Sequence, residues 1–121
     1  MGVNPDDKNG TVFAGNYKLF VNGGILTTNI KVANYAASEW ADFVFDSAYR
    51  LMPLWEVEKF IGANKHLPNV PSAAEIEKNG LNLPQMQSLQ MQKVEELTLY
   101  MIQMKKEIDR LKQEVDRLHN R

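Results

Sequence analysis

The sequence predicts an α+β chain with short N-terminal β segments, a small helical or loop region, and a long C-terminal helix that forms a coiled coil. Three observations predict this class. Apolar residues alternate near the N-terminus, Pro and Gly punctuate the middle, and an unbroken heptad pattern fills the last third. We expect a fibre-like β segment with an irregular lead-in over residues 1–37, a small α/β or helical region packing on the coil over 38–83, and the coiled-coil helix over 84–121.

Composition excludes several classes of protein. The chain has 121 residues, a formal net charge of −1 and no cysteine. This charge gives no electrostatic footprint for nucleic acid or an anionic membrane, and the lack of cysteine excludes disulfides. No apolar run approaches the ~20 residues of a membrane span. The polar residues after Met1 form no signal peptide, and we expect the natural chain to extend upstream.

The first regular segment, YKLFVNGGILTTNIKV, spans residues 17–32. Apolar and polar residues alternate on both sides of Asn22-Gly23-Gly24, which predicts a strand, a tight turn and a second strand. Two strands alone are marginal in water. We therefore expect this hairpin to find further sheet elsewhere.

The middle of the chain carries several helix signals. The run WADFVF, residues 40–45, is either a strand or a buried loop, and Pro53 opens a helical pattern that Gly62 can end. Ser72 and Glu75 have the spacing of a capping box for a short helix. Asn82 can cap the last helix, which has a proline in its first turn.

The last helix is predicted to run from Pro84 to about His119, a rod of about 54 Å at ~1.5 Å per residue. Its apolar positions are separated by alternating steps of three and four, which is a heptad repeat. Position a holds Gln87, Val94, Met101, Ile108 and Val115. Position d holds Gln90, Leu97, Met104, Leu111 and Leu118.

These ten residues are the predicted oligomer interface. A helix lying on its own domain is the simpler alternative, but the upstream residues are too few to cover the whole rod. We therefore expect self-association. Gln87 and Gln90 either hydrogen-bond across chains and fix the register or are solvated at a frayed end.

The flanking charges favour parallel helices. Position g carries Glu107 and Glu114, and position e carries Lys112 and His119. Antiparallel helices would place like charges opposite each other, whereas parallel helices place Glu107 against Lys112 of the neighbour. Each exposed pair contributes only tenths of a kcal/mol.

Apolar residues outside the heptad positions indicate where the small region docks. Leu99 and Ile102 lie at outer positions and need cover, which we expect from upstream segments. The candidates on the other side of this contact are the aromatic residues Trp40, Phe43 and Phe45.

The number of helices in the coil is a separate question. Taken alone, the lower heptads have β-branched residues at position a and leucine at position d, which is the preference of dimers.

No arrangement of residues predicts catalysis. The two histidines, His66 and His119, are far apart in the sequence, and no metal-binding or phosphate-binding motif occurs. His66 is best explained as a packing or turn residue. We therefore expect no enzyme activity, no catalytic residue, no metal and no cofactor.

The segments that carry a family resemblance are YKLFVNGGI, WADFVF, LWEVEKFIGANKHLPNVPSAAEIEKNGLNL and VEELTLYMI. Together they resemble the C-terminal end of bacterial and phage tail-fibre-like and surface fibre proteins. The order of parts is also similar to the intramolecular chaperone domains of tailspikes, which are homotrimers. The self-cleaving members start at a Ser-Asp pair, where this chain has Ala41-Asp42, so we expect no autoproteolysis.

The resemblance implies a parallel homotrimer and a chaperone-like trimerisation module at the end of a fibre. Its partners would be its own copies and upstream fibre segments, with no nucleic acid and no membrane span. The implied location is extracellular, at a cell surface or on a virion or tail-like particle. The alternative function is a fibre tip that binds a cell-surface receptor or glycan, and a dimeric adaptor and a self-cleaving chaperone are further options.

Overall fold

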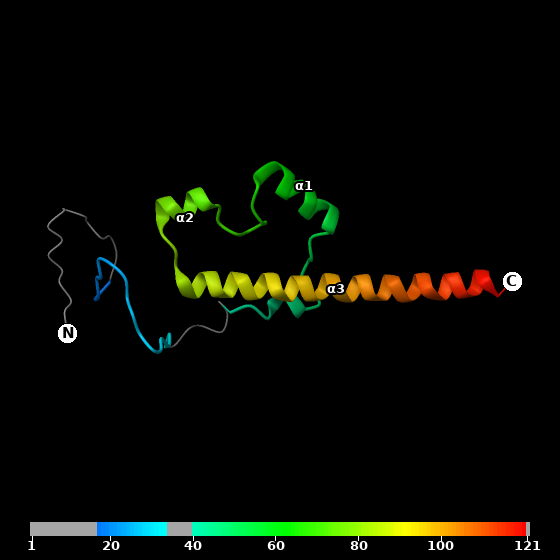
Figure 1. Cartoon of the computed structure of the whole chain (residues 1–121), viewed down its shortest axis with the longest axis horizontal. Coiled ribbons are helices and arrows are strands. Elements are labelled where there is room, and N and C mark those ends of the chain that lie inside the picture. Colours follow the sequence, from blue (N-terminus) through cyan, green and yellow to red (C-terminus); the bar gives the residue numbers. More distant parts are fainter. Residues whose placement is uncertain (1–16, 34–39, 121) are drawn as a thin grey trace. The chain divides into compact units, whose positions relative to one another are not determined.

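The computed structural model describes residues 17–33 and 40–120, and its regular structure there is entirely helical (Figure 1). The elements are the 3₁₀ turn η2 (Phe43–Phe45), α1 (Leu54–Asn64), α2 (Ala73–Asn79) and α3 (Leu83–His119). The predicted α+β class is therefore wrong, because these described residues contain no strand. The predicted lead-in over residues 1–16 lies outside them. The chain divides into two compact units, Met1–Val32 and Ala33–Arg121.

The predicted hairpin over residues 17–32 does not form. Every residue from 17 to 33 except Phe20 is exposed, so pairing two strands here would bury little apolar surface. A local alternative also competes, because the Thr27 hydroxyl donates to the Asn29 carbonyl over 3.1 Å and accepts from the Asn29 N–H. The alternating pattern is present in the sequence, but within the described residues 17–33 neither of its faces is covered.

Helix α1 begins after Pro53, as predicted, but it continues past Gly62. It ends where Lys65 adopts a left-handed conformation with φ 62°, and the Lys65 N–H closes the helix on the Ile61 carbonyl. Gly62 is therefore an interior residue, and the expected glycine stop is wrong at this position. The left-handed conformation costs a lysine more than it would cost glycine.

Helices α2 and α3 begin as the sequence predicts. The Ser72 hydroxyl accepts from the Glu75 N–H, and the Glu75 carboxylate accepts from the Ser72 N–H, which completes a capping box. Gly80 ends α2 with φ 79°. The Asn82 side chain accepts from the Gln85 N–H and caps the 37-residue helix α3. The predicted caps and the length of the last helix are confirmed.

The 3₁₀ turn η2 packs against α3 and contributes the largest of the almost fully buried side chains among the described residues. Val44, in the middle of η2, is 1% exposed, and the preceding Ala41 is equally buried. The run WADFVF is thus neither a strand nor a simple loop. It is a tight helical turn that presses its smaller apolar side chains inward.

We expect Val44→Ala to lower the free energy of unfolding by about 2 kcal/mol. The change removes two methyl groups at ~0.8 kcal/mol each and leaves a small cavity beside α3. Chemical denaturation followed by circular dichroism measures the effect. Ser47→Ala, at an exposed position two residues after η2, is the control and should change stability by less than 0.5 kcal/mol. Equal effects of the two variants would contradict this assignment of the core.

Candidate oligomerisation interface

The segment between Trp40 and Met52 crosses the outer faces of α3. Around a helix the heptad positions follow one another in the order a, e, b, f, c, g, d. The segment reaches α3 at position b, where the Asp42 N–H donates to Glu95 Oε2 over 3.1 Å. It leaves at position g, where the Tyr100 hydroxyl donates to the Met52 carbonyl over 2.5 Å. The chain therefore covers positions b, f, c and g in turn.

Glu95 is a buried carboxylate at position b. It is 6% exposed, and burial raises its pKa, with the nearby Asp42 carboxylate raising it further. Asp42 itself has φ 104°, a conformation that a residue with a side chain rarely adopts. The hydrogen bond from its N–H to Glu95 helps to hold this backbone conformation against α3. The contact between η2 and α3 is thus partly polar and is not only a packing contact.

Four polar side chains form a cluster at positions f, c and g. The Tyr49 hydroxyl donates to Glu96 over 2.5 Å, Gln92 donates to both groups, and Lys93 forms an ion pair with Glu96 at 3.0 Å. Burial on its own would raise the pKa of Glu96, but these hydrogen bonds and the Lys93 charge outweigh it, and the pKa is lowered. Burial raises the pKa of Tyr49 and Tyr100. Through these hydrogen bonds the cluster fixes the position of Tyr49 against α3.

The a and d positions are left uncovered by the described chain. From Val94 to Leu118, the eight apolar residues at these positions are between 47% and 64% exposed. Gln87 and Gln90, at the start of the same stripe, are also exposed. A surface helix of a folded domain normally turns its apolar stripe inward, whereas here the chain covers polar faces and leaves the apolar stripe open. This uncovered a/d stripe is the strongest candidate for a functional site.

The residues predicted to dock the small region on the coil have mixed positions. Leu99 is half-buried, whereas Ile102 is 45% exposed. Trp40, Phe43 and Phe45 keep 37%, 44% and 56% of their surface exposed. The Phe43 ring contacts the Tyr49 ring at 5.8 Å between centroids. The deepest contacts instead come from Ala41 and Val44, which lie between the aromatic residues.

Sequence reasoning missed the polar side of this contact. Gln92, Glu95 and Glu96 look like solvated outer positions of a coiled coil, and nothing local indicates that upstream segments cover them. One signal was available, because Tyr100 places a large aromatic ring at position g, next to the apolar stripe. Its 7% exposure shows that the covering chain reaches this far around the helix.

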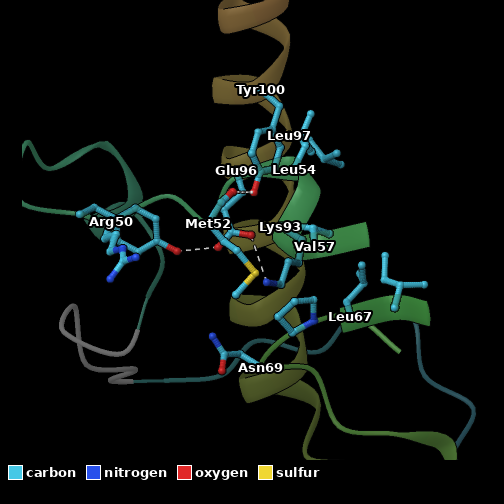
Figure 2. Close-up of a pocket in the computed structure, with 13 residues that line it drawn as sticks. Arg50, Met52, Leu54, Val57, Leu67, Asn69, Lys93, Glu96, Leu97 and Tyr100 are labelled. Carbon is cyan, nitrogen blue, oxygen red and sulfur yellow. Dashed lines mark hydrogen bonds and ion pairs between the residues drawn. The ribbon is translucent and has the colours of Figure 1, made fainter. Parts of the chain in front are cut away.

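A cleft of 320 Å³ lies beside the a/d stripe, between α1, the following loop and α3 (Figure 2). Leu54, Val57 and Leu67 line it on one side. Lys93, Leu97 and Tyr100 of α3 line the other. Leu97 belongs both to this cleft and to position d, so the cleft and the stripe are continuous.

The described residues show few other features of a functional site. Among them, no group of three or more His, Asp or Glu side chains could hold a metal ion. No helix in the same residues is long and apolar enough to cross a membrane. The ring of His66 packs edge-on against Phe60, with 5.4 Å between centroids, as expected for a packing residue.

Comparison of the chain with protein-family models, with curated proteins and with solved structures finds no match. The uncovered a/d stripe and the cleft beside it are therefore the features from which function is argued.

We expect Glu95→Gln to raise the free energy of unfolding at pH 7, because a neutral amide replaces a buried charge. The raised pKa of Glu95 means that the folded state holds its proton more tightly than the unfolded state. Stability is therefore lost as pH rises through the window between the two pKa values. A glutamine keeps an acceptor for the Asp42 N–H and has no charge to bury. Its advantage should vanish below pH ~3, where both states are protonated. Thermal melts from pH ~3 to ~8 measure this, with exposed Glu58→Gln as the control.

We expect Tyr49→Phe to destabilise the protein by about 1–2 kcal/mol at pH 7. The change removes the donor to Glu96 and the acceptor for Gln92. The lowered pKa of Glu96 contributes stability that is lost as pH falls, so the variant should lose less stability on acidification than the parent. Denaturation at pH 7 and at about pH 3, below the ordinary pKa of a glutamate, tests both effects. Tyr17→Phe, at an exposed tyrosine, is the control, and a variant as stable as this control would refute the role of the cluster.

Proposed function

We propose that this chain is a non-enzymatic trimerisation and assembly module, which associates in parallel through the a/d stripe of α3 at the C-terminal end of a fibre protein. The uncovered stripe carries the proposal. Its eight apolar residues from Val94 to Leu118 continue over more than three heptads. A monomer would expose them all to water, which is unfavourable for a soluble chain. A second α3 presenting the same stripe buries them by knobs-into-holes packing.

The charges on both flanks support a parallel arrangement. Glu107 at position g would face Lys112 at position e of the neighbour. Within the chain, Glu107 already pairs with Arg110 at 2.6 Å, but the two side chains are 56% and 60% exposed. An exposed pair of this kind is weak, so Glu107 can exchange partners at little cost. Parallel chains also place all small regions at the same end of the coil.

Two considerations favour three chains. The apolar surface of α3 widens beyond a and d on the e–b flank, where Met91 and Ile102 are exposed. A helix in a trimer contacts two neighbours and can bury a wider surface than a helix in a dimer. The second consideration is the resemblance of segments such as HLPNVPSAAEIEKNG to the ends of trimeric fibre proteins.

The proposed mechanism of assembly is entropic. A coiled coil forms from contacts local in sequence, so it can nucleate quickly. Once formed, it holds the attached chains at an effective concentration in the millimolar range. Upstream fibre segments then pair in register without the entropy loss of bringing three separate chains together. An extracellular or particle-bound location follows from this proposal.

We expect the double variant Leu97→Asp/Met104→Asp to be monomeric. Two carboxylates per chain at successive d positions would have to be buried without partners, which costs several kcal/mol for each chain. Sedimentation equilibrium at micromolar concentration measures the mass of parent and variant. The control is Lys106→Asp/Gln113→Asp, which places the same charges at outward f positions and should stay trimeric.

A parent chain that sediments as a stable monomer would contradict the proposal. A parent that sediments as a dimer would contradict the trimer and leave the parallel coiled coil to be revised. Trimers of the Leu97→Asp/Met104→Asp variant would show that association does not use the a/d stripe.

A further inference from the structure

We propose that the cleft between α1 and α3 is a docking site for the adjacent copy of this chain, occupied by the e–b flank of the neighbour's α3. This inference rests on the proposed parallel association and adds a second contact to it. The contact joins the small helical region of one chain to the coil of the next. It is distinct from the a/d packing and could fail while that packing holds.

The cleft is unsuited to stand open in water. The cleft has a volume of 320 Å³. Leu54, Val57 and Leu67 give its outer wall an apolar character, and Leu54 and Leu67 are 48% and 43% exposed. Helix α1 contains no buried residue. An apolar occupant would complete the packing of this helix.

Continuity with the a/d stripe identifies the occupant. The inner wall of the cleft is made by Lys93 and Tyr100 at position g and Leu97 at position d (Figure 2). In a parallel coiled coil, position g of one helix faces position e of its neighbour. The neighbour's α3 would therefore lie along this wall with its e positions turned toward α1. Ile102, the position b residue that follows the covered Glu95, would be turned the same way.

The e–b flank carries side chains suited to the cleft. In this register Lys93 faces Thr98 of a second copy, and Ile102 lies one turn further along the same flank. Ile102 is an apolar side chain at an outer position, and 45% of its surface is exposed within its own chain. Its position b is on the opposite side of α3 from the cleft. It can therefore enter only the cleft of another copy.

The consequence is a ring of contacts around the coil. Each α1 and the loop after it would hold the α3 of the next chain, and the last chain would close on the first. The upper heptads are thereby fixed by two layers of contact. The lower heptads, beyond the reach of α1, are held by the a/d stripe alone.

Engineered cysteines test the contact directly, because the chain has no cysteine of its own. A tagged Val57→Cys chain and an untagged Ile102→Cys chain are refolded together and oxidised mildly. Non-reducing electrophoresis then measures the disulfide-linked heterodimer. A disulfide forms only where Cα atoms approach within ~7 Å, so we expect at least a tenfold higher yield than for the control pair of Val57→Cys with Gln113→Cys. Circular dichroism checks folding, and Leu54→Cys replaces Val57→Cys if helicity is lost.

The outcomes separate this inference from the proposed function. A high yield for the first pair, with trimers in sedimentation, supports both. Trimers with equal yields for the two pairs overturn the docking of Ile102 and leave the coiled coil intact. Equal yields together with binding of the apolar dye anilinonaphthalene sulfonate by the trimer indicate a small-molecule cleft and also overturn it. Monomers overturn the proposed function and this inference together.

Discussion

The surface of α3 is larger than the rest of the described chain covers. The structure therefore depends on which faces of α3 the upstream segments cover and which faces they leave exposed. A 37-residue helix is about 55 Å long at ~1.5 Å per residue. The segment from Trp40 to Asn82 reaches only its first half, and there it covers the b, f, c and g positions. The apolar a and d positions from Val94 to Leu118 are left exposed. Little of the apolar surface of α3 is therefore buried within the chain itself.

Polar contacts explain why the segment from Trp40 to Met52 follows the b, f, c and g positions of α3. The hydrogen bonds of Glu95, Glu96 and Tyr100 are made to residues 42, 49 and 52, so they fix the path of the covering segment at three points. Such contacts are specific in direction, whereas apolar packing is not. They keep Ala41 and Val44 on the outer face of α3 and keep the segment away from the apolar stripe. A covering segment with only apolar contacts could slide onto that stripe and block association.

This arrangement is consistent with a module whose function is to bring identical chains together. The small region makes hydrogen bonds to the upper part of α3, and the cleft lies between α1 and α3. The lower part of α3 carries alternating charges, and its a and d residues from Ile108 to Leu118 are exposed. The alternative of a receptor-binding or glycan-binding tip would need a recognition surface of its own, and the cleft shares Leu97 with the a/d stripe. The geometry therefore favours contact between copies over a separate ligand site.

The sequence by itself determined the elements whose signals are local. The capping box of Ser72 and Glu75, the cap at Asn82, and the heptad spacing each depend on residues a few positions apart, and the structure has the predicted helices. The prediction of strands over residues 17–32 was wrong. Alternation predicts a strand only where another element covers one face, and both faces of this segment are exposed in the described residues 17–33. The tertiary structure alone decided that Glu95 and Gln92 are buried, that Val44 packs inward, and that the cleft adjoins Leu97. These features depend on contacts between residues far apart in the sequence, 53 positions for Asp42 with Glu95 and 43 for Tyr49 with Gln92, which no local pattern encodes.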